Sequence, residues 1–234
     1  MSWTLHPYQS NQTLVLELAA SIAATLAGAI SVRGRAALAV SGGGTPRTLF
    51  DALAVIDIPW SQVVITLVDE RWEDEADPAS NALLVRRHLL RAQAAAAQFM
   101  GLKTDERDPF SAVAGVDKQL RERVLPLDLA VLGMGEDAHT ASFFRAAEGL
   151  DAALAPDTTT ACCGVRPVRA PHPRMTLTLN TLLDSQRLLL HLVGASKLTV
   201  LNEAMQPGAA AELPVRALLH QERRPVEIYY AARD

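Results

Sequence analysis

Apolar residues along the chain follow two periods that alternate with each other. Between positions 14 and 30 they recur at every fourth residue, at Leu14, Leu18, Ile22, Leu26 and Ile30. This spacing predicts a helix with one face in the core, ending near Gly34. The next apolar run, residues 36–40, is short and leads into glycines, so we expect a buried strand there.

The same alternation continues toward the C-terminus. Further helices are expected over Pro46–Leu53, from about Asn81 to Leu90, and along a segment that carries Val113, Leu120 and Val124. Further strands are expected at residues 63–68, 127–132, 174–179, 187–193 and 226–230. Short apolar strands separated by helices favour an α/β fold, with a doubly wound, mostly parallel sheet covered by helices on both faces in a Rossmann-like three-layer arrangement.

One segment, residues 144–173, follows neither period. Pro156, Pro167, Pro171 and Pro173 break any helix or strand pattern there, so we expect an irregular path over the surface. No other break is long enough to mark a linker, and 234 residues with 49% hydrophobic content suffice for one core. We therefore expect residues 1–234 to form a single domain.

The charge and the start of the chain exclude several classes of function. A formal net charge of -4 gives no broad basic field, so nucleic acid is not an expected partner. The first seven residues lack the features of a signal sequence, and no stretch approaches the roughly 18 apolar residues of a membrane span. We therefore expect a cytoplasmic protein without membrane contact. The only two cysteines, Cys162 and Cys163, are adjacent, which indicates reduced thiols.

The richest chemistry follows the predicted strand 127–132. The next residues, 133–142, read GMGEDAHTAS and bring glycine, carboxylate, imidazole and hydroxyl groups to the carboxyl end of a strand. Open α/β sheets bind their ligands at this end. The glycines let the backbone turn sharply, so Asp137 and His139 can project into the same small volume. We interpret these two residues as an acid/base pair.

A second glycine-rich loop follows the strand at 36–40. It consists of Ser41, Gly42, Gly43, Gly44 and Thr45, after which Pro46 opens a helix. Free backbone N–H groups and the positive end of the helix dipole would bind a phosphate here, whereas a tight turn without a ligand is the alternative. Because no Gly-Lys-Ser/Thr sequence follows, the loop is not a nucleotide P-loop, and ATP is not implied.

Three further charged features are ambiguous by themselves. Residues 69–71 (DER) follow a predicted strand and, taken alone, are best interpreted as a solvated acidic turn. Arg174, which enters another predicted strand, is by itself no more than a surface residue. Lys197 lies in the first turn of a predicted helix, where a cation opposes the helix dipole unless an anion is also bound. Lys197 is therefore a candidate phosphate ligand, with a purely structural role as the alternative.

Taken together, these segments resemble the 6-phosphogluconolactonases of the glucosamine/galactosamine-6-phosphate isomerase superfamily. The matching pieces are SGGGTP at 41–46, DER at 69–71, SN at 80–81, GMGEDAHTAS at 133–142, Arg174 with its threonine-rich strand, and GASK at 194–197. Their order and spacing agree over nearly the whole chain. The resemblance implies hydrolysis of 6-phospho-D-glucono-1,5-lactone to 6-phosphogluconate, the second step of the oxidative pentose phosphate pathway, with no metal or organic cofactor.

The resemblance also implies roles for individual residues. His139 would be the acid/base that activates water at the ring ester, and Asp137 and Asp69 would orient it or the substrate. Arg71 would bind the phosphate or the sugar. The phosphate would be held by Ser41, Gly42, Gly43, Gly44, Thr45, Arg174 and Lys197. This division is chemically consistent, because ester hydrolysis needs an activated water on one side of the carbonyl and a stabilised oxyanion on the other.

Three positions depart from the family pattern. Ala138 stands where the family usually has glycine, Arg145 where it usually has proline, and Gly44 where serine is common. If position 138 requires a positive φ, alanine is strained there by roughly 1 kcal/mol. Neither Ala138 nor Arg145 removes a proposed chemical group.

Three other functions are alternatives. A glucosamine-6-phosphate deaminase/isomerase shares the phosphate loop, but its segment typically continues into Ile-Ala-Phe-Asn-Glu-Pro, whereas residues 140–145 read TASFFR here. A non-catalytic sugar-phosphate sensor would keep the loop, yet this chain also retains the acid/base residues. Residues 133–138 fit a Gly-x-Gly-x-x-Ala dinucleotide fingerprint, but Pro156 interrupts the helix that such a site needs.

Other reactive residues have simpler explanations. Ser41 and Ser142 lie outside a Gly-x-Ser-x-Gly elbow, so we expect them to cap a helix or contact phosphate and not to form an acyl-enzyme. Structural roles are expected for the histidines in apolar contexts, His88, His191 and His220. His172, between two prolines, is a candidate for the rim of the site.

Overall fold

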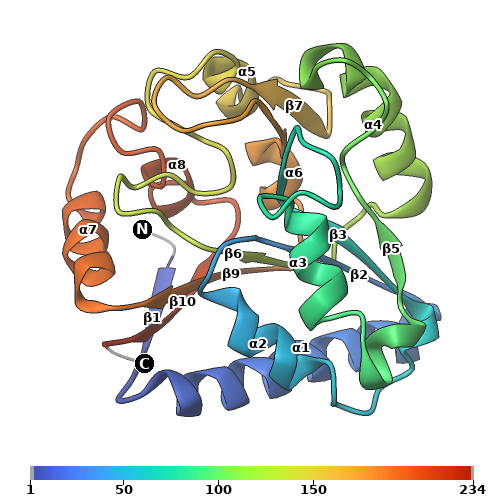
Figure 1. The fold of residues 1–234 in the computed structure, drawn as a ribbon. Coiled ribbons are helices and arrows are strands. Elements are labelled where there is room, and N and C mark those ends of the chain that lie inside the picture. The colour runs from blue at the N-terminus through green and yellow to red at the C-terminus, as the bar shows by residue number, and fades with distance from the viewer. Residues whose placement is uncertain (1–2, 233–234) are drawn as a thin grey trace.

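A seven-stranded parallel sheet forms the centre of the protein, whose computed structural model describes residues 3–232 (Figure 1). In order across the sheet, the strands are β1 (Trp3–Tyr8), β10 (Val226–Ala231), β9 (Arg187–Val193), β6 (Leu129–Leu132), β2 (Ala36–Val40), β3 (Val63–Leu67) and β5 (Gln98–Met100). All six neighbouring pairs are parallel. The predicted α/β fold with a mostly parallel sheet is confirmed.

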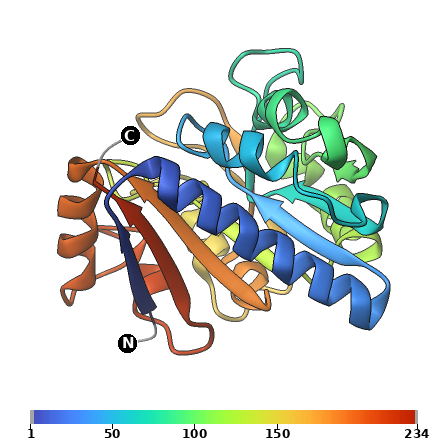
Figure 2. The ribbon, with the colours of Figure 1, turned by 90° about the horizontal axis from the view of Figure 1, so that it is seen from below.

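Helices cover both faces of this sheet. On one face lie α1 (Asn11–Arg33) and α2 (Pro46–Leu53), which are below the strands in Figure 1, and α1 crosses in front of the strands in Figure 2. On the other face lie α4 (Pro109–Arg123), α5 (Leu150–Leu154), α6 (Leu179–Leu183) and α8 (Arg216–Leu219). The remaining helices are α3 (Asn81–His88), α7 (Ala195–Met205) and two short 3-10 helices, Trp60–Gln62 and Ala92–Ala96. The buried apolar side chains form one continuous cluster between these layers.

A second, three-stranded antiparallel sheet lies beside the first. Its order is β4 (Asp69–Arg71), β8 (Arg174–Leu177) and β7 (Cys162–Val165). The strand predicted at 174–179 therefore ends earlier and belongs to this small sheet, because Thr178 accepts a hydrogen bond from the backbone N–H of Thr181 and begins α6. The prediction of an irregular path over 144–173 is also wrong in part, since this segment contains α5 and β7.

The helix α1 follows its predicted apolar stripe and has defined ends. Ser10 caps its first turn by accepting from the Thr13 N–H, and Gly34 ends it with φ 73° while its N–H donates to the Ile30 carbonyl. By length and mean hydropathy α1 also meets the requirements of a membrane span, contrary to the sequence prediction. Glu17 and other polar residues interrupt the apolar run without lowering its average much. In this structure the stripe packs on the sheet as part of the core.

The chain reverses its direction of travel across the sheet at β2. From β2 it proceeds to β3 and β5 on one side, and then returns to the other side to form β6, β9 and β10. The loops after β2 and β6 therefore diverge, although the two strands pair and the Ser41 N–H donates to the Val131 carbonyl at 3.0 Å. Such a reversal leaves a crevice at the carboxyl ends of the strands, where open α/β sheets bind ligands.

Two glycines, Gly28 inside α1 and Gly34 at its C-terminal cap, provide opposite tests of this local structure. Gly28→Ala should raise the free energy of unfolding by about 0.5–1 kcal/mol, because Gly28 is an exposed helix-interior residue and an added Cβ meets no heavy atom within 4 Å. Gly34→Ala should lower it by about 1 kcal/mol, because alanine is strained at φ 73°. Urea denaturation would measure both. Shifts of the same sign in the two variants would contradict the assigned helix end.

Candidate active site

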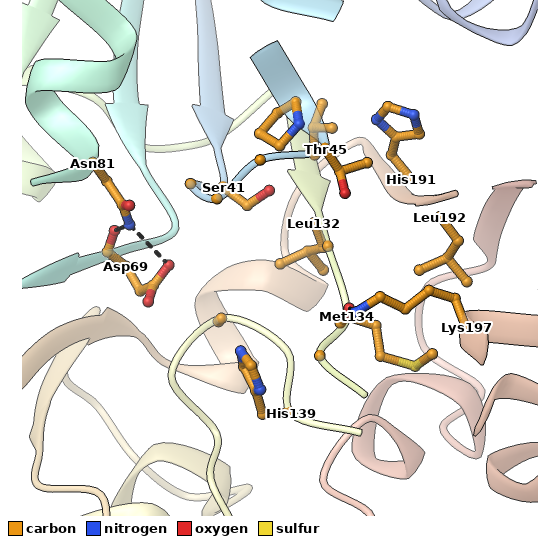
Figure 3. Close-up of a pocket in the computed structure, with 18 of the residues that line it drawn as sticks. Ser41, Thr45, Asp69, Asn81, Leu132, Met134, His139, His191, Leu192 and Lys197 are labelled. Carbon is orange, nitrogen blue, oxygen red and sulfur yellow. Dashed lines mark hydrogen bonds between the residues drawn. The ribbon is translucent and has the colours of Figure 1, made fainter. Parts of the chain in front are cut away.

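A cavity of about 250 Å³ opens at the carboxyl ends of β2, β6 and β9. All the residues that the sequence predicted for catalysis or phosphate binding line this cavity, except Asp137. Figure 3 shows Thr45 and His191 along one wall, Asp69 and Asn81 along another, and Lys197 and His139 on the remaining sides. The sequence motifs, which lie up to 156 residues apart, therefore meet at one place.

The glycine loop forms the wall between β2 and α2. The first turn of α2 begins at Pro46, directly after Thr45, so the positive end of the helix dipole faces the cavity. Gly43 has φ 96°, which favours glycine. A Cβ on Gly42 would lie 1.8 Å from Asn81 Oδ1, so the side chain of Asn81 excludes any larger residue at position 42. The predicted phosphate loop thus has glycine where the backbone and its neighbours require it.

The predicted acid/base pair is hydrogen-bonded. His139 Nδ1 lies 2.5 Å from Asp137 Oδ1, and this hydrogen bond is the largest cause that lowers the pKa of Asp137 to about 2. With Nδ1–H donating to the carboxylate, a neutral imidazole keeps its lone pair on Nε2. Gly135 must be glycine, because a Cβ there would lie 2.1 Å from His139 Nδ1 and 2.4 Å from Asp137 Oδ1.

Ala138 and Arg145, two of the departures from the family pattern, have different surroundings. Ala138 has φ 62°, so the backbone does require the left-handed conformation that glycine would adopt freely. The residue is fully buried, and its carbonyl accepts from the Val215 N–H at 3.0 Å, which holds the strained turn in place. Arg145 is exposed and is not among the residues that line the cavity. The alanine therefore carries the expected strain of roughly 1 kcal/mol without displacing the His139–Asp137 pair.

Asp69 has a different set of partners from Asp137. Its Oδ2 accepts a 2.5 Å hydrogen bond from Ser142 Oγ and lies 3.7 Å from the Arg174 guanidinium, with both side chains of the ion pair almost fully buried. Asn81 Nδ2 donates to the Asp69 carbonyl at 2.8 Å. Burial lowers the pKa of Arg174, and the Asp69 carboxylate opposes that shift. Of the two carboxylates predicted to orient the imidazole or the substrate, Asp137 is the one bonded to His139.

Glu70 has a structural role that was not predicted from the sequence. This carboxylate is 1% exposed and accepts hydrogen bonds from the backbone N–H groups of Arg71, Asn81 and Ala82 and from the Ser80 hydroxyl. Burial raises its pKa, while these backbone donors oppose the shift. Glu70 thus fixes the N-terminus of α3 beneath the cavity. The interpretation of residues 69–71 as a solvated acidic turn is wrong, because both carboxylates are buried.

Lys197 and Arg71 supply positive charge to the cavity, and both already donate to backbone carbonyls. Lys197 Nζ donates to the Met134 carbonyl, and burial lowers the pKa of this lysine. Next to it, Ser196 Oγ donates to Glu136 at 2.8 Å, which ties the first turn of α7 to the loop after β6. Arg71 donates to the Ala79 carbonyl at 2.5 Å. An incoming anion would compete with these carbonyls for the cations.

Two histidines outside the acid/base pair differ from each other in position. His191 lines the cavity from β9, is 3% exposed, and has a pKa lowered to about 4 by burial; neither ring nitrogen has a hydrogen-bond partner among residues 3–232. His172, predicted at the rim, instead pairs with Glu73 at 2.6 Å and does not line the cavity. Within residues 3–232, no cluster of three or more His, Cys, Asp and Glu side chains is placed to hold a metal ion.

The dinucleotide alternative does not fit the observed backbone. In a nicotinamide-binding site, the Gly-x-Gly-x-x-Ala segment opens a helix whose N-terminus faces the pyrophosphate. Here residues 133–138 form a loop, and the next helix, α5, begins only at Leu150. The fingerprint at 133–138 is therefore a coincidence of sequence.

Comparison with known proteins gives a consistent result. Residues 9–227 match the family described as Glucosamine-6-phosphate isomerases/6-phosphogluconolactonase. A 6-phosphogluconolactonase of Rhizobium meliloti is 40% identical over 231 residues, which cover 99% of this chain and all of the relative. A 6-phosphogluconolactonase of Pseudomonas aeruginosa is 42% identical over 213 residues, which cover 91% of this chain and 88% of the relative.

Solved structures extend this similarity to three dimensions. The crystal structure of a 6-phosphogluconolactonase from Shewanella baltica OS155 superposes with a TM-score of 0.95 at 39% identity, over 98% of each chain. A monomeric glucosamine-6-phosphate deaminase superposes with a TM-score of 0.72 at 17% identity, over 97% of each chain. The second similarity shows a shared fold alone.

The hydrogen bond between His139 and Asp137 predicts a titration that can be measured. The Asp137 carboxyl should titrate near pKa 2 in the wild type, and its pKa should return toward the ordinary value of 3.8 in His139→Ala. Because the folded-state pKa is depressed, the pair stabilises the fold above about pH 4, and this contribution is lost as the pH falls through 2. Carboxyl ¹³C NMR would follow the titration. An unchanged midpoint in the variant would contradict the observed pairing.

Proposed function

The chain belongs to the glucosamine-6-phosphate isomerase/6-phosphogluconolactonase family, and we propose that it hydrolyses 6-phospho-D-glucono-1,5-lactone to 6-phosphogluconate. One observation carries this proposal: His139, which is hydrogen-bonded to Asp137, lines the same cavity as a glycine loop at a helix N-terminus. The first provides acid/base chemistry and the second provides an anion site. A phosphorylated cyclic ester needs both, at opposite ends of one molecule.

In this reaction His139 acts as the acid/base. Nε2 takes a proton from water as the water oxygen bonds to the lactone carbonyl carbon, and the Asp137 carboxylate stabilises the imidazolium that forms. The tetrahedral intermediate then collapses, the ring C–O bond breaks, and the departing oxygen takes the proton back from the imidazolium. The product acid ionises in water. A positioned base of this kind supplies roughly 10²–10⁴-fold in rate.

The phosphate end of the substrate is assigned to the glycine loop and Lys197. Backbone N–H groups of residues 42–45 and the dipole of α2 favour a dianion there, and Lys197 exchanges its contact with the Met134 carbonyl for the phosphate. Arg71 and Arg174 add positive charge from the other wall, where Arg174 is also paired with Asp69. Fixing this end holds the reacting carbonyl against the water activated at His139.

Competing functions are distinguished by residues 140–145. They read TASFFR, without the Asn-Glu pair that the deaminases of this superfamily typically carry, so amino-sugar ring opening lacks its usual carboxylate. A sugar-phosphate sensor would retain the loop and Lys197 but would not need the His139–Asp137 pair. We therefore favour the lactonase over both.

We further propose that the protein works as one domain in the cytoplasm, without a metal or organic cofactor and on a small-molecule substrate. Both Cys162 and Cys163 are buried free thiols, and burial raises their pKa values, that of Cys162 to about 12. Inert thiols of this kind suit a reducing compartment. The net charge of -4 offers no attraction to nucleic acid.

Activity and its loss in two variants test the assignment. Freshly prepared lactone should be hydrolysed faster by the wild type than in buffer alone, after subtraction of the spontaneous rate. His139→Ala should lower kcat by roughly 10²–10⁴-fold with little change in KM. Lys197→Ala should chiefly raise KM, by roughly tenfold or more, because a charge-assisted hydrogen bond to phosphate is lost. Equal, mild losses in both variants would refute these roles.

The matched control for His139 is His172, which also pairs with a carboxylate but lies outside the cavity. His172→Asn should leave kcat and KM close to wild type, since asparagine tolerates φ 68°. A wild-type protein that fails to exceed the buffer rate would eliminate the lactonase. Release of ammonia from glucosamine 6-phosphate would establish the deaminase in its place.

The glycine loop gives a second, steric test of substrate binding. Gly42→Ala should raise KM by roughly tenfold, because the new Cβ would collide with Asn81 and push the loop away from the phosphate. Gly44→Ala should have a much smaller effect, since a Cβ there meets no heavy atom within 4 Å and the backbone N–H is retained. Initial-rate kinetics would measure both. The same KM in the two variants would show that Asn81 does not set the loop's position.

A further inference from the structure

We propose that Phe144 is a positioning residue for His139: its ring sets the plane of the catalytic imidazole and connects it to the buried Arg174–Asp69 ion pair. This inference rests on the proposed hydrolysis, in which His139 is the acid/base. Neither the acid/base pair nor the phosphate loop includes Phe144. The residue instead lies behind His139 and makes no contribution of its own to the chemistry.

The contacts of the Phe144 ring carry the argument. Its centroid lies 4.3 Å from that of the His139 imidazole, with 24° between the two planes, which is a stacked arrangement. The Arg174 guanidinium carbon lies 4.8 Å from the same centroid, within the range of a cation–π contact. Phe144 is only 6% exposed and the Arg174 side chain 8%, so the cation–π contact is shielded from water. The ring therefore touches the acid/base and the buried cation at once.

The hydrogen bond to Asp137 cannot orient His139 by itself. It holds one ring atom, Nδ1, at 2.5 Å from a carboxylate that is largely exposed, and the terminal torsion of a histidine side chain has a broad minimum. Rotation about the direction of that bond would swing Nε2 away from the lactone carbonyl. Stacking on a flat ring removes this rotation, because a twist of the imidazole would lose the face-to-face contact. Two contacts therefore define the direction of the Nε2 lone pair.

The orientation of Phe144 is in turn set by buried parts of the protein. Its N–H donates to the Ser142 carbonyl at 3.1 Å, and the Ser142 hydroxyl donates to Asp69 Oδ2 at 2.5 Å. Asp69 also holds Arg174, whose strand pairs with β4 in the small sheet. Asp69 thus acts on the imidazole through Arg174, Ser142 and the Phe144 ring. This explains how a carboxylate that makes no hydrogen bond to His139 can still determine the geometry of that residue.

Kinetics of Phe144 variants test this role. Phe144→Leu and Phe144→Met keep an apolar side chain but lose the flat ring, so kcat should fall roughly tenfold or more while KM stays within about twofold. Phe144→Tyr keeps the ring and should recover most of kcat. The control is Phe110→Leu, which removes a ring that also carries a cation, Arg166, at 5.1 Å but lies away from the cavity; its kcat should match the wild type.

Proton NMR of the histidine side chains tests the stack without relying on activity or on the folding of a Phe144 variant. In the wild type, the ring protons of His139, assigned by their absence in His139→Ala, should be shifted upfield by the ring current of Phe144. Wild-type kcat in Phe144→Leu, or His139 signals at ordinary positions in the wild type, would overturn the inference. Either result would leave the lactonase proposal standing, whereas a wild type without lactonase activity but with the upfield signals would overturn the lactonase alone.

Discussion

The reversal of the chain across β2 is the constraint on which the rest of the structure depends. Strands β3 and β5 are added on one side of β2, whereas β6, β9 and β10 are added on the other side. The loops that leave β2 and β6 therefore lead in different directions. They separate and leave space at the carboxyl edge. The glycine loop lies on one side of this space and the loop with His139 lies on the other. The proposed anion site and the proposed acid/base site, which lie more than 80 residues apart in sequence, are thereby held across one cavity by the parallel sheet.

The small antiparallel sheet positions the buried ion pair beside the cavity. The pairing of β4 with β8 brings Asp69 and Arg174 together from positions more than 100 residues apart, with both side chains almost fully buried. Two buried charges of opposite sign are tolerated only because each has further partners, among them Ser142 and Asn81 around Asp69. Glu70, the neighbour of Asp69, is satisfied by the N-terminus of α3. One short segment, DER, therefore ties the small sheet, α3 and the cavity wall together.

Much of the fold was predictable because long apolar periods reflect burial directly. The stripe of α1 and the apolar runs of β2, β3, β6, β9 and β10 were recognised with ends within a few residues. Missed elements such as β1 and β7 carry a weak pattern. β1 is a half-exposed edge strand that contains Pro7, and β7 becomes a strand only through its pairing with β8. Most of the proposed site residues were singled out because they follow strands. Partners such as Glu70, Asn81 and Phe144 were not assigned roles, since their contacts depend on three-dimensional packing.

The contact between Lys197 and the Met134 carbonyl has a consequence for turnover. Substrate and product carry the same phosphate, so any free energy gained by holding that group delays departure of the opened acid as much as it favours arrival of the lactone. When the phosphate leaves, the Lys197 ammonium would again donate to the Met134 carbonyl. Phosphate binding would then replace one hydrogen bond with another, so the net gain in free energy would be smaller than for a free ammonium donor. With Lys197 in its proposed role, the cavity would retain its product less tightly, and this weaker binding of the anion would favour a faster cycle.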